Sequence, residues 1–162
     1  ILRGPPDSQE LLERTNKDSS LQGVELSGEY LLPDCWSLYG NFWYTFGRDN
    51  VDQVPLSRIP PAQGTVGLRR RWDSGKNWLD VHSWLVREQD RLSPRDISDT
   101  GRIPGGGTPG YATVNCSLGR MITDHQRISL DVENLFDEQY RVHGSGSDGP
   151  GINAVVTYEL LR

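Results

Sequence analysis

The sequence has few cysteines, no excess of positive charge and no long apolar run. Its 162 residues include two Cys, at positions 35 and 116, which is too few for a disulfide framework or a four-cysteine metal centre. The formal net charge of −5 gives no support to a nucleic-acid partner. The stretch richest in uncharged aromatic residues, 35–47, has 13 residues, whereas a membrane helix needs about 20 apolar ones. A helical membrane protein is therefore excluded, but a membrane β-barrel is not, because alternating strands never form apolar runs.

Apolar and polar residues alternate with a period of two, which is typical of β-strands. In residues 22–32 one face is apolar and the other polar: Val24, Leu26, Tyr30 and Leu32 oppose Glu25, Ser27 and Glu29. The same pattern predicts seven strands, at residues 22–32, 36–46, 62–72, 77–87, 111–122, 126–136 and 152–161. Residues 11–17 fit either a short helix or the outer end of the first strand. With 18 Gly and 10 Pro to form turns, the sequence predicts an all-β antiparallel up-and-down meander.

Strand length and loop length both indicate a membrane barrel. The predicted strands have about 10–11 residues, the length that a tilted strand needs to cross a bilayer, whereas globular strands usually have about 5–6. Short turns alternate with long loops at residues 47–61, 88–110 and 137–151. This alternation places all short turns at one rim and all long loops at the other, as in outer-membrane barrels. The alternative is a soluble β-sandwich, or a small stand-alone barrel of the lipocalin type that binds an apolar ligand.

The alternation also assigns side chains to lipid or to the barrel lumen. The lumen face would carry charges that a dry core could not hold: Glu25, Glu29, Asp80, His82, Asp131, Glu133 and Glu159. The lipid face would carry Leu26, Phe42, Leu68, Val81, Val114, Leu130 and Val156. Aromatic residues near strand ends are expected to form the interfacial girdle: Trp36, Trp72, Trp78, Tyr111 and Tyr140.

No arrangement of residues predicts catalysis or a bound cofactor. We interpret Asp131, Glu133 and Glu159 as part of a solvated lumen face rather than as paired catalytic carboxylates. The three His residues lack the spacing of a metal site. The Gly-rich stretch 144–149 lacks the Lys-Ser/Thr pair of a phosphate-binding loop. The protein is therefore expected not to be an enzyme, and to have no cofactor and no metal of its own.

The last third of the chain resembles the C-terminal signature of TonB-dependent outer-membrane receptors. Residues 130–141 read LDVENLFDEQYR, followed by HGSG at 143–146 and PG at 150–151. Earlier segments are similar to the family in the same order, namely NK at 16–17 with GVEL at 23–26, PLSRIPP at 55–61 and GYATVN at 110–115. Together these matches cover about residues 14–158. One departure is Ile152, where the family often has Arg.

This resemblance implies a 22-stranded transmembrane β-barrel of the bacterial outer membrane, filled by an N-terminal plug domain. Such receptors take up a metal chelate of the ferric siderophore, haem or cobalamin type, with energy passed on by TonB. This chain would supply the last seven strands. Residues 1–20 would be a loop and the outer end of a barrel strand, and residues 21–162 the C-terminal barrel segment, with the plug domain absent from this chain.

The resemblance also implies partners and a ligand-binding region. The partners would be outer-membrane lipid, the metal-chelate substrate, TonB acting through the missing plug domain, and the barrel-assembly machinery, with no nucleic acid. That machinery reads an aromatic residue at the end of most family members, whereas this chain ends Leu160-Leu161-Arg162. The chelate is expected to contact charged and aromatic side chains of the long loops: Arg48, Asp49, Arg58, Arg91, Arg95, Arg102, Tyr140, Arg141 and His143.

Overall fold

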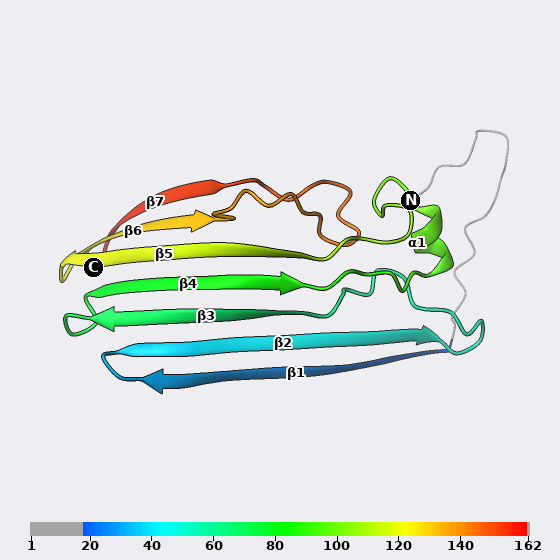
Figure 1. The fold of residues 1–162 in the computed structure, drawn as a ribbon, viewed down its shortest axis with the longest axis horizontal. Helices are drawn as coiled ribbons and strands as arrows, with labels where there is room; N and C mark the ends of the chain where they lie inside the picture. Colours follow the sequence, from blue (N-terminus) through cyan, green and yellow to red (C-terminus); the bar gives the residue numbers. More distant parts are fainter. Residues whose placement is uncertain (1–17, 162) are drawn as a thin grey trace.

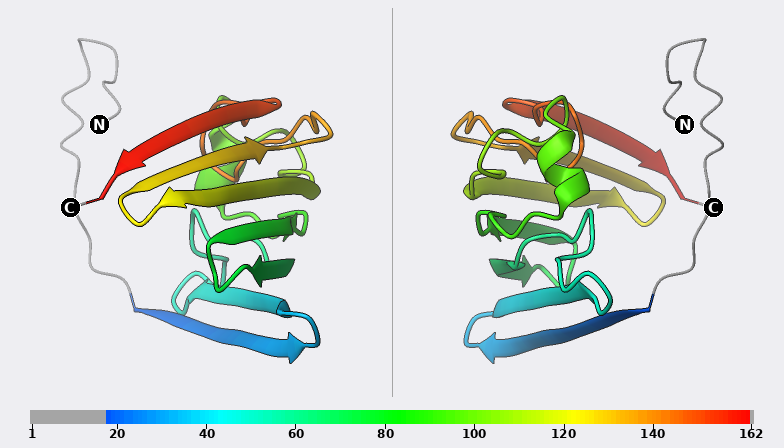
Figure 2. Two further views of the ribbon diagram at one scale, coloured as in Figure 1. Left: turned by 90° about the vertical axis from the view of Figure 1, so that its left-hand side faces the viewer. Right: turned by 90° about the vertical axis from the view of Figure 1, so that its right-hand side faces the viewer.

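The computed structural model describes residues 18–161, which form one curved antiparallel sheet and one short helix. The strands are β1 (Ser19–Leu32), β2 (Trp36–Asp49), β3 (Gln63–Trp72), β4 (Asn77–Val86), β5 (Tyr111–Thr123), β6 (Gln126–Glu133) and β7 (Asn153–Leu160), and helix α1 (Pro94–Ser98) lies between β4 and β5. The order in the sheet is the order in the sequence (Figure 1). The sheet is curved when it is seen from its ends (Figure 2). The predicted seven-stranded up-and-down meander is confirmed.

The observed strand bounds differ by one residue from the predicted ones in β3, β4, β5 and β7, and by three residues in β1, β2 and β6. β1 and β2 form a longer hairpin, because their register continues without a break over the full length of both strands. β6 ends at Glu133, before the predicted end, because Asn134 has a left-handed backbone with a φ of 51°. The Asn134 side chain donates to the carbonyls of Glu138 and Pro150, at 2.9 and 3.1 Å, and so shapes the loop that follows. The short helix or strand end predicted at 11–17 lies outside the described residues. The same holds for the first 17 residues of the segment 1–20, predicted as a loop and the outer end of a strand.

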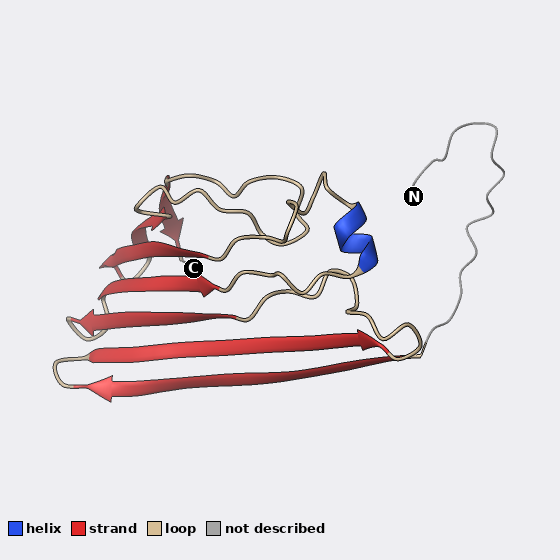
Figure 3. Cartoon of the chain, turned by 45° about the vertical axis from the view of Figure 1, so that its right-hand side comes forward, coloured by secondary structure: helices blue, strands red, loops and turns tan. Residues whose placement is uncertain are grey.

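Short and long connections lie at opposite ends of the sheet, as predicted. Residues 33–35, 73–76 and 124–125 form the short turns at one end. Residues 50–62, 87–110 and 134–152 form the long loops at the other end, where α1 also lies (Figure 3). Two short turns use left-handed backbone, with φ between 54° and 61° at Asp34, Cys35, Asp73 and Ser74, which matches the twist of the paired strands. No helix among residues 18–161 has the length and apolar content needed to cross a membrane.

The apolar face of the sheet, here called the outer face, is exposed. The register places Leu79, Leu118, Leu130 and Val156 opposite one another in one row across β4–β7. Leu118 is 44% exposed and Val156 is 68% exposed. Only three hydrophobic side chains of residues 18–161 are buried. An apolar surface of this size is covered by lipid or by another protein in a stable molecule, which argues against the soluble alternative.

The inner face carries a polar network around Asp80 on β4. The Asp80 carboxylate accepts hydrogen bonds from the Tyr39 hydroxyl at 2.7 Å and from the Arg69 guanidinium at 2.8 Å. Nδ1 of His82 lies 2.9 Å from the same carboxylate. The Tyr39 ring packs directly over Gly67, where a Cβ atom would overlap with the ring. These contacts join β2, β3 and β4, and they satisfy the charges of Asp80 and Arg69.

The predicted aromatic girdle is wrong for Trp78, Tyr111 and Tyr140. Trp78 has the same parity in β4 as Asp80, and its ring packs against Gly119 on the inner face. Tyr111 and Tyr140 contact each other on the inner side, with ring centroids 4.6 Å apart. Nearness to a strand end does not decide which face a side chain occupies, whereas parity does. The two remaining members, Trp36 and Trp72, lie on the outer face as predicted.

Candidate functional site

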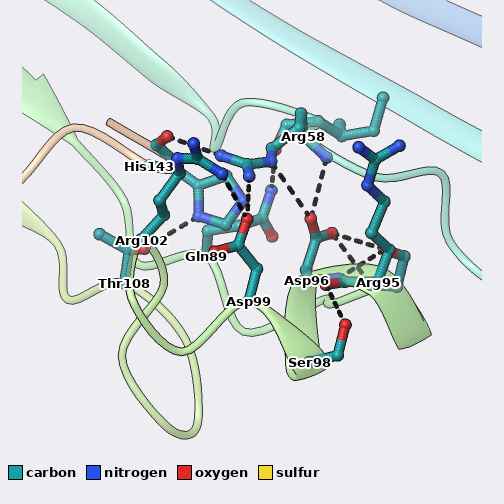
Figure 4. A network of polar contacts seen from close by, with 12 residues as sticks. Arg58, Gln89, Arg95, Asp96, Ser98, Asp99, Arg102, Thr108 and His143 are labelled. Carbon is teal, nitrogen blue, oxygen red and sulfur yellow. Dashed lines mark hydrogen bonds and ion pairs between the residues drawn. The ribbon is translucent and has the colours of Figure 1, made fainter. Parts of the chain in front are cut away.

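The three long loops pack together at one end of the sheet, around helix α1 (Figure 4). The helix begins with a capping box, in which the Ser93 hydroxyl accepts from the Asp96 amide and the Asp96 carboxylate accepts from the Ser93 amide, both at 3.1 Å. Pro94 occupies the first turn, where its missing amide hydrogen is no loss. The side chain of Asp96 is fixed by these bonds, and the residue is 2% exposed. A buried carboxylate therefore stands at the centre of the loop region.

Arg58 ties the three loops to one another. Its backbone amide donates to Asp96 Oδ1 at 3.2 Å, and its guanidinium donates to the carbonyl of Gly144 at 2.6 Å. The same guanidinium forms an ion pair with Asp99. Arg58 has a φ of 61°, a left-handed conformation that is uncommon for a residue with a side chain. Contacts to both its amide and its side chain hold this conformation, so that one residue joins the loops 50–62, 87–110 and 134–152.

Arg102 and His143 complete the network around Arg58. Arg102 donates to the Asp99 carboxylate at 3.1 Å. Nδ1 of His143 lies 2.9 Å from the Thr108 hydroxyl, which brings the third loop against the second. Burial lowers the pKa of the His143 imidazole below its ordinary value of 6.5. The positive charge of Arg58 also lowers this pKa, whereas the negative charge of Asp96 raises it. His143 is therefore neutral at pH 7.

Three guanidinium groups lie around two carboxylates beside helix α1, although the three long loops together contain six Arg and eight Asp or Glu residues. Arg58, Arg95 and Arg102, here called the arginine cluster, lie around Asp96 and Asp99 (Figure 4). Arg95 is exposed, and its side chain makes no hydrogen bond or ion pair with residues 18–161. Three positive and two negative groups leave the cluster with a net charge of +1. An exposed cluster of this sign attracts anionic ligands.

Three other predicted residues, Arg48, Asp49 and Arg91, lie at the loop end of β2, and two of them make contacts with their side chains. The Arg91 guanidinium lies 3.6 Å from the centroid of the Phe46 ring and donates to the carbonyl of Gly47 at 2.6 Å. Asp49 is buried, and its carboxylate accepts from the amides two and three residues later at 2.9 and 3.0 Å. Arg48 is exposed. Arg91 and Asp49 thus hold the loops in place through contacts within the chain.

Tyr140 belongs to an aromatic cluster with Tyr111 and Trp84. The Trp84 centroid lies 5.4 Å from that of Tyr111 and 6.3 Å from that of Tyr140, with near-perpendicular rings. Beside the cluster, Nε of Arg141 donates to Asp148 at 2.7 Å. A cavity of about 600 Å³ is lined by Tyr111, Tyr140, Arg141 and Asp148 together with other loop residues. This aromatic pocket combines flat ring faces with a guanidinium group.

The structure thus brings together part of the predicted set. Arg58, Arg102 and His143 share one network, and Tyr140 and Arg141 line the aromatic pocket. Sequence reasoning missed five of the residues that build these sites: Trp84, Asp96, Asp99, Thr108 and Tyr111. The pattern Ser93-Pro94-x-Asp96 is a helix-start signal that could have located the buried carboxylate. Among the described residues, no three His, Cys, Asp or Glu side chains gather closely enough to hold a metal ion.

A curved meander with one apolar and one polar face, short turns at one end and long loops at the other, defines a segment of an outer-membrane β-barrel wall. Residues 4–135 match the family model described as "TonB dependent receptor-like, beta-barrel". The chain therefore belongs to the TonB-dependent receptor β-barrel family, whose members are transport receptors of the outer membrane. The resemblance and the predicted location are confirmed, and the count of 22 strands stays a prediction.

Solved structures of this family share the fold. The copper transporter OprC superposes with a TM-score of 0.79 at 23% identity, over 90% of this chain and 23% of that one. The FrpB iron transporter from Neisseria meningitidis gives 0.67 at 15% identity, over 88% and 23%. The closed form of the ferric-catecholate import receptor Fiu from E. coli K12 gives 0.63 at 18% identity, over 88% and 21%. This chain thus spans less than a quarter of the length of these proteins. A comparison with curated proteins finds no match.

Proposed function

We propose that this chain supplies part of the barrel wall and of the ligand-binding loops of a TonB-dependent receptor that takes up a metal chelate. The observation that carries the proposal is the convergence of three long loops on Arg58. The long loops of outer-membrane barrels face the outside of the cell. A loop surface held in one conformation costs little ordering entropy when it binds a ligand.

The chemistry of the loops favours an anionic ferric chelate. The arginine cluster carries a net positive charge, and Arg95 offers an exposed guanidinium for charge-assisted hydrogen bonds. The aromatic pocket offers the rings of Tyr111 and Tyr140, which can stack on flat groups of a ligand. It adds no net positive charge, because Asp137, Glu138 and Asp148 also line it and Arg141 is paired with Asp148. Because a chelate brings the ligands of its own metal, the receptor needs no metal centre. Among the similar structures, one is of a ferric-catecholate import receptor and one is of an iron transporter.

Energy coupling and assembly form the second part of the proposal. The inner face carries paired charges around Asp80, and an interior filled by a polar plug domain would give such groups further partners. TonB would act through this plug, on the side of the short turns, which face the periplasm in this class of barrel. The barrel-assembly machinery would insert the complete receptor into the membrane.

A binding experiment on the complete receptor tests this function. Cells that display it in the outer membrane are offered three probes: a ferric tris-catecholate, a ferric hydroxamate and haem. We expect saturable binding of an anionic ferric chelate. The variant Arg95→Gln should bind about fivefold more weakly, which corresponds to about 1 kcal/mol. Arg87→Gln is the matched control, because Arg87 is exposed at the loop end of β4 and lies outside the arginine cluster.

Two results would contradict the proposal. In the first, none of the three probes binds to cells that display the assembled receptor. In the second, Arg95→Gln and Arg87→Gln weaken binding equally, so that only the overall charge of the loops matters. If haem binds and neither ferric siderophore binds, the protein is still a chelate receptor, but its ligand is haem rather than a ferric siderophore.

A further inference from the structure

A groove lies on the outer face of the sheet, at the end that carries the short turns. It has a volume of about 520 Å³ and apolar walls formed by Trp72, Leu79, Leu118, Ile128, Leu130 and Val156. Arg120 also lines the groove, on the side nearer to the turn between β5 and β6. Arg120 is exposed, and its side chain makes no hydrogen bond or ion pair with residues 18–161. An elongated apolar ligand with a charged head matches this order of groups.

The strand residues that point outward near the groove carry only positive charges, whereas Asp73 and Asp124 lie in the short turns beyond the strand ends. Alternation from Leu79 fixes which strand residues point outward, and the outward positions of the seven strands include no Asp or Glu. They include Arg70 and Arg120 in the half of the sheet near the short turns, and Arg48 at the opposite end. The nearby carboxylate of Asp80 points inward. The groove therefore selects for a negatively charged head group.

Arg70 stands next to the groove and is oriented by two tryptophans. Its guanidinium carbon lies 5.3 Å from the centroid of the Trp36 ring and 5.7 Å from that of the Trp72 ring. The register places Trp72 and Arg120 in one row on either side of Asn77, and Arg70 lies on β3 in the next outward row, opposite Leu79. Tryptophan and arginine together are typical of the level of the lipid head groups.

We propose that this groove binds an anionic phospholipid of the periplasmic leaflet. One acyl chain lies against the row formed by Leu79, Leu118 and Leu130. The phosphate lies at Arg120, and Arg70 supplies a second positive charge from β3, on the same outer face. The short turns face the periplasm in this class of barrel, which places the site in the inner half of the membrane. The site shares no residue with the loops that are proposed to bind the chelate.

Native mass spectrometry of the complete receptor tests the site. The purified receptor is titrated with phosphatidylglycerol and with phosphatidylcholine of the same acyl chains. We expect at least tenfold greater retention of phosphatidylglycerol. The variant Arg120→Gln should lose this retention by at least fivefold, and Leu118→Trp, which fills the groove and leaves both arginines in place, should do the same. Arg48→Gln is the matched control, because it removes an outward arginine at the other end of the sheet, and it should leave retention unchanged.

Three results would overturn the lipid site. The first is that glycerol phosphate displaces phosphatidylglycerol from the receptor. Glycerol phosphate has the head group but no acyl chain, so we expect no displacement. The other two are equal retention of the two lipids and equal losses in Arg120→Gln and Arg48→Gln. If Arg120→Gln does not assemble, Leu118→Trp and the glycerol phosphate competition decide the question. Chelate binding is measured on Arg120→Gln and Leu118→Trp, and it should be unchanged, so that a failure of the proposed function remains distinguishable.

Discussion

The carboxylate of Asp96 accepts a hydrogen bond from the backbone amide of Arg58 at 3.2 Å, across 38 residues of sequence. The same carboxylate accepts from the Ser93 hydroxyl at 2.9 Å. One buried group therefore starts helix α1 and fixes the loop 50–62 against the loop 87–110. Buried networks of this kind rigidify a structure when every member is satisfied.

Removal of this carboxylate should open the loops and leave the sheet intact. Asp96→Ala removes the carboxylate half of the capping box of α1 and leaves the Arg58 amide without its partner, for a cost of about 2 kcal/mol. Hydrogen exchange of residues 87–110 should accelerate about 30-fold, whereas β4 and β5 should keep their protection. Asp90→Ala is the control, since Asp90 is exposed in the same loop. Equal acceleration in the two variants would mean that Asp96 holds nothing in place.

The packing of the loops should weaken in acid because of His143. Burial lowers the pKa of its imidazole in the folded loops below 6.5, the ordinary value that the imidazole has in the opened loops. Between these two pKa values, the opened loops bind more protons than the folded loops. The contribution of His143 is then complete above about pH 6.5 and is lost as the pH falls below it. Protection of residues 134–152 against exchange, corrected for the intrinsic rate, should fall over this range. His143→Gln should remove the dependence, and His125→Gln, in a short turn at the other end, should not.

The sheet could be predicted from the sequence because each strand residue of a barrel has one of two surroundings. Lipid on one side and a polar interior on the other make the alternation visible residue by residue. The loops lack such a rule. α1 has five residues and depends on a capping box and on Arg58, which is distant in sequence. The error at Trp78 has a different origin, because aromatic residues near a strand end occur on both faces and only parity with Asp80 decides between them.

The two faces should respond differently to the same added charge. Leu130 on the outer face and Ser129 on the inner face are neighbours on β6. In bilayers, Leu130→Arg should destabilise the complete receptor by about 2–4 kcal/mol if the site is near the midplane. Ser129→Arg should cost much less, because its guanidinium would lie beside Asp131 in the polar interior. Urea unfolding of the two variants measures the difference, and equal costs would reject the assignment of faces.

A methyl group at Gly67 should break the inner polar network without touching a charged residue. The Cβ atom of Gly67→Ala would overlap with the ring of Tyr39, and the ring cannot move aside while its hydroxyl stays 2.7 Å from Asp80. We expect a loss of about 1–3 kcal/mol in the free energy of unfolding, the usual cost of overpacking.

Gly28→Ala provides the control for this last substitution. Gly28 is also a strand glycine, and its added Cβ atom would meet no atom within 4 Å, so its effect should stay within about 0.5 kcal/mol. Tyr39→Phe separates the two causes in Gly67→Ala: it removes the hydroxyl and keeps the ring, so it loses the bond to Asp80 without any overlap. If Gly67→Ala costs no more than Tyr39→Phe, the hydrogen bond from β2 to Asp80 on β4 accounts for the stability here, rather than the close packing of the ring on Gly67 of β3.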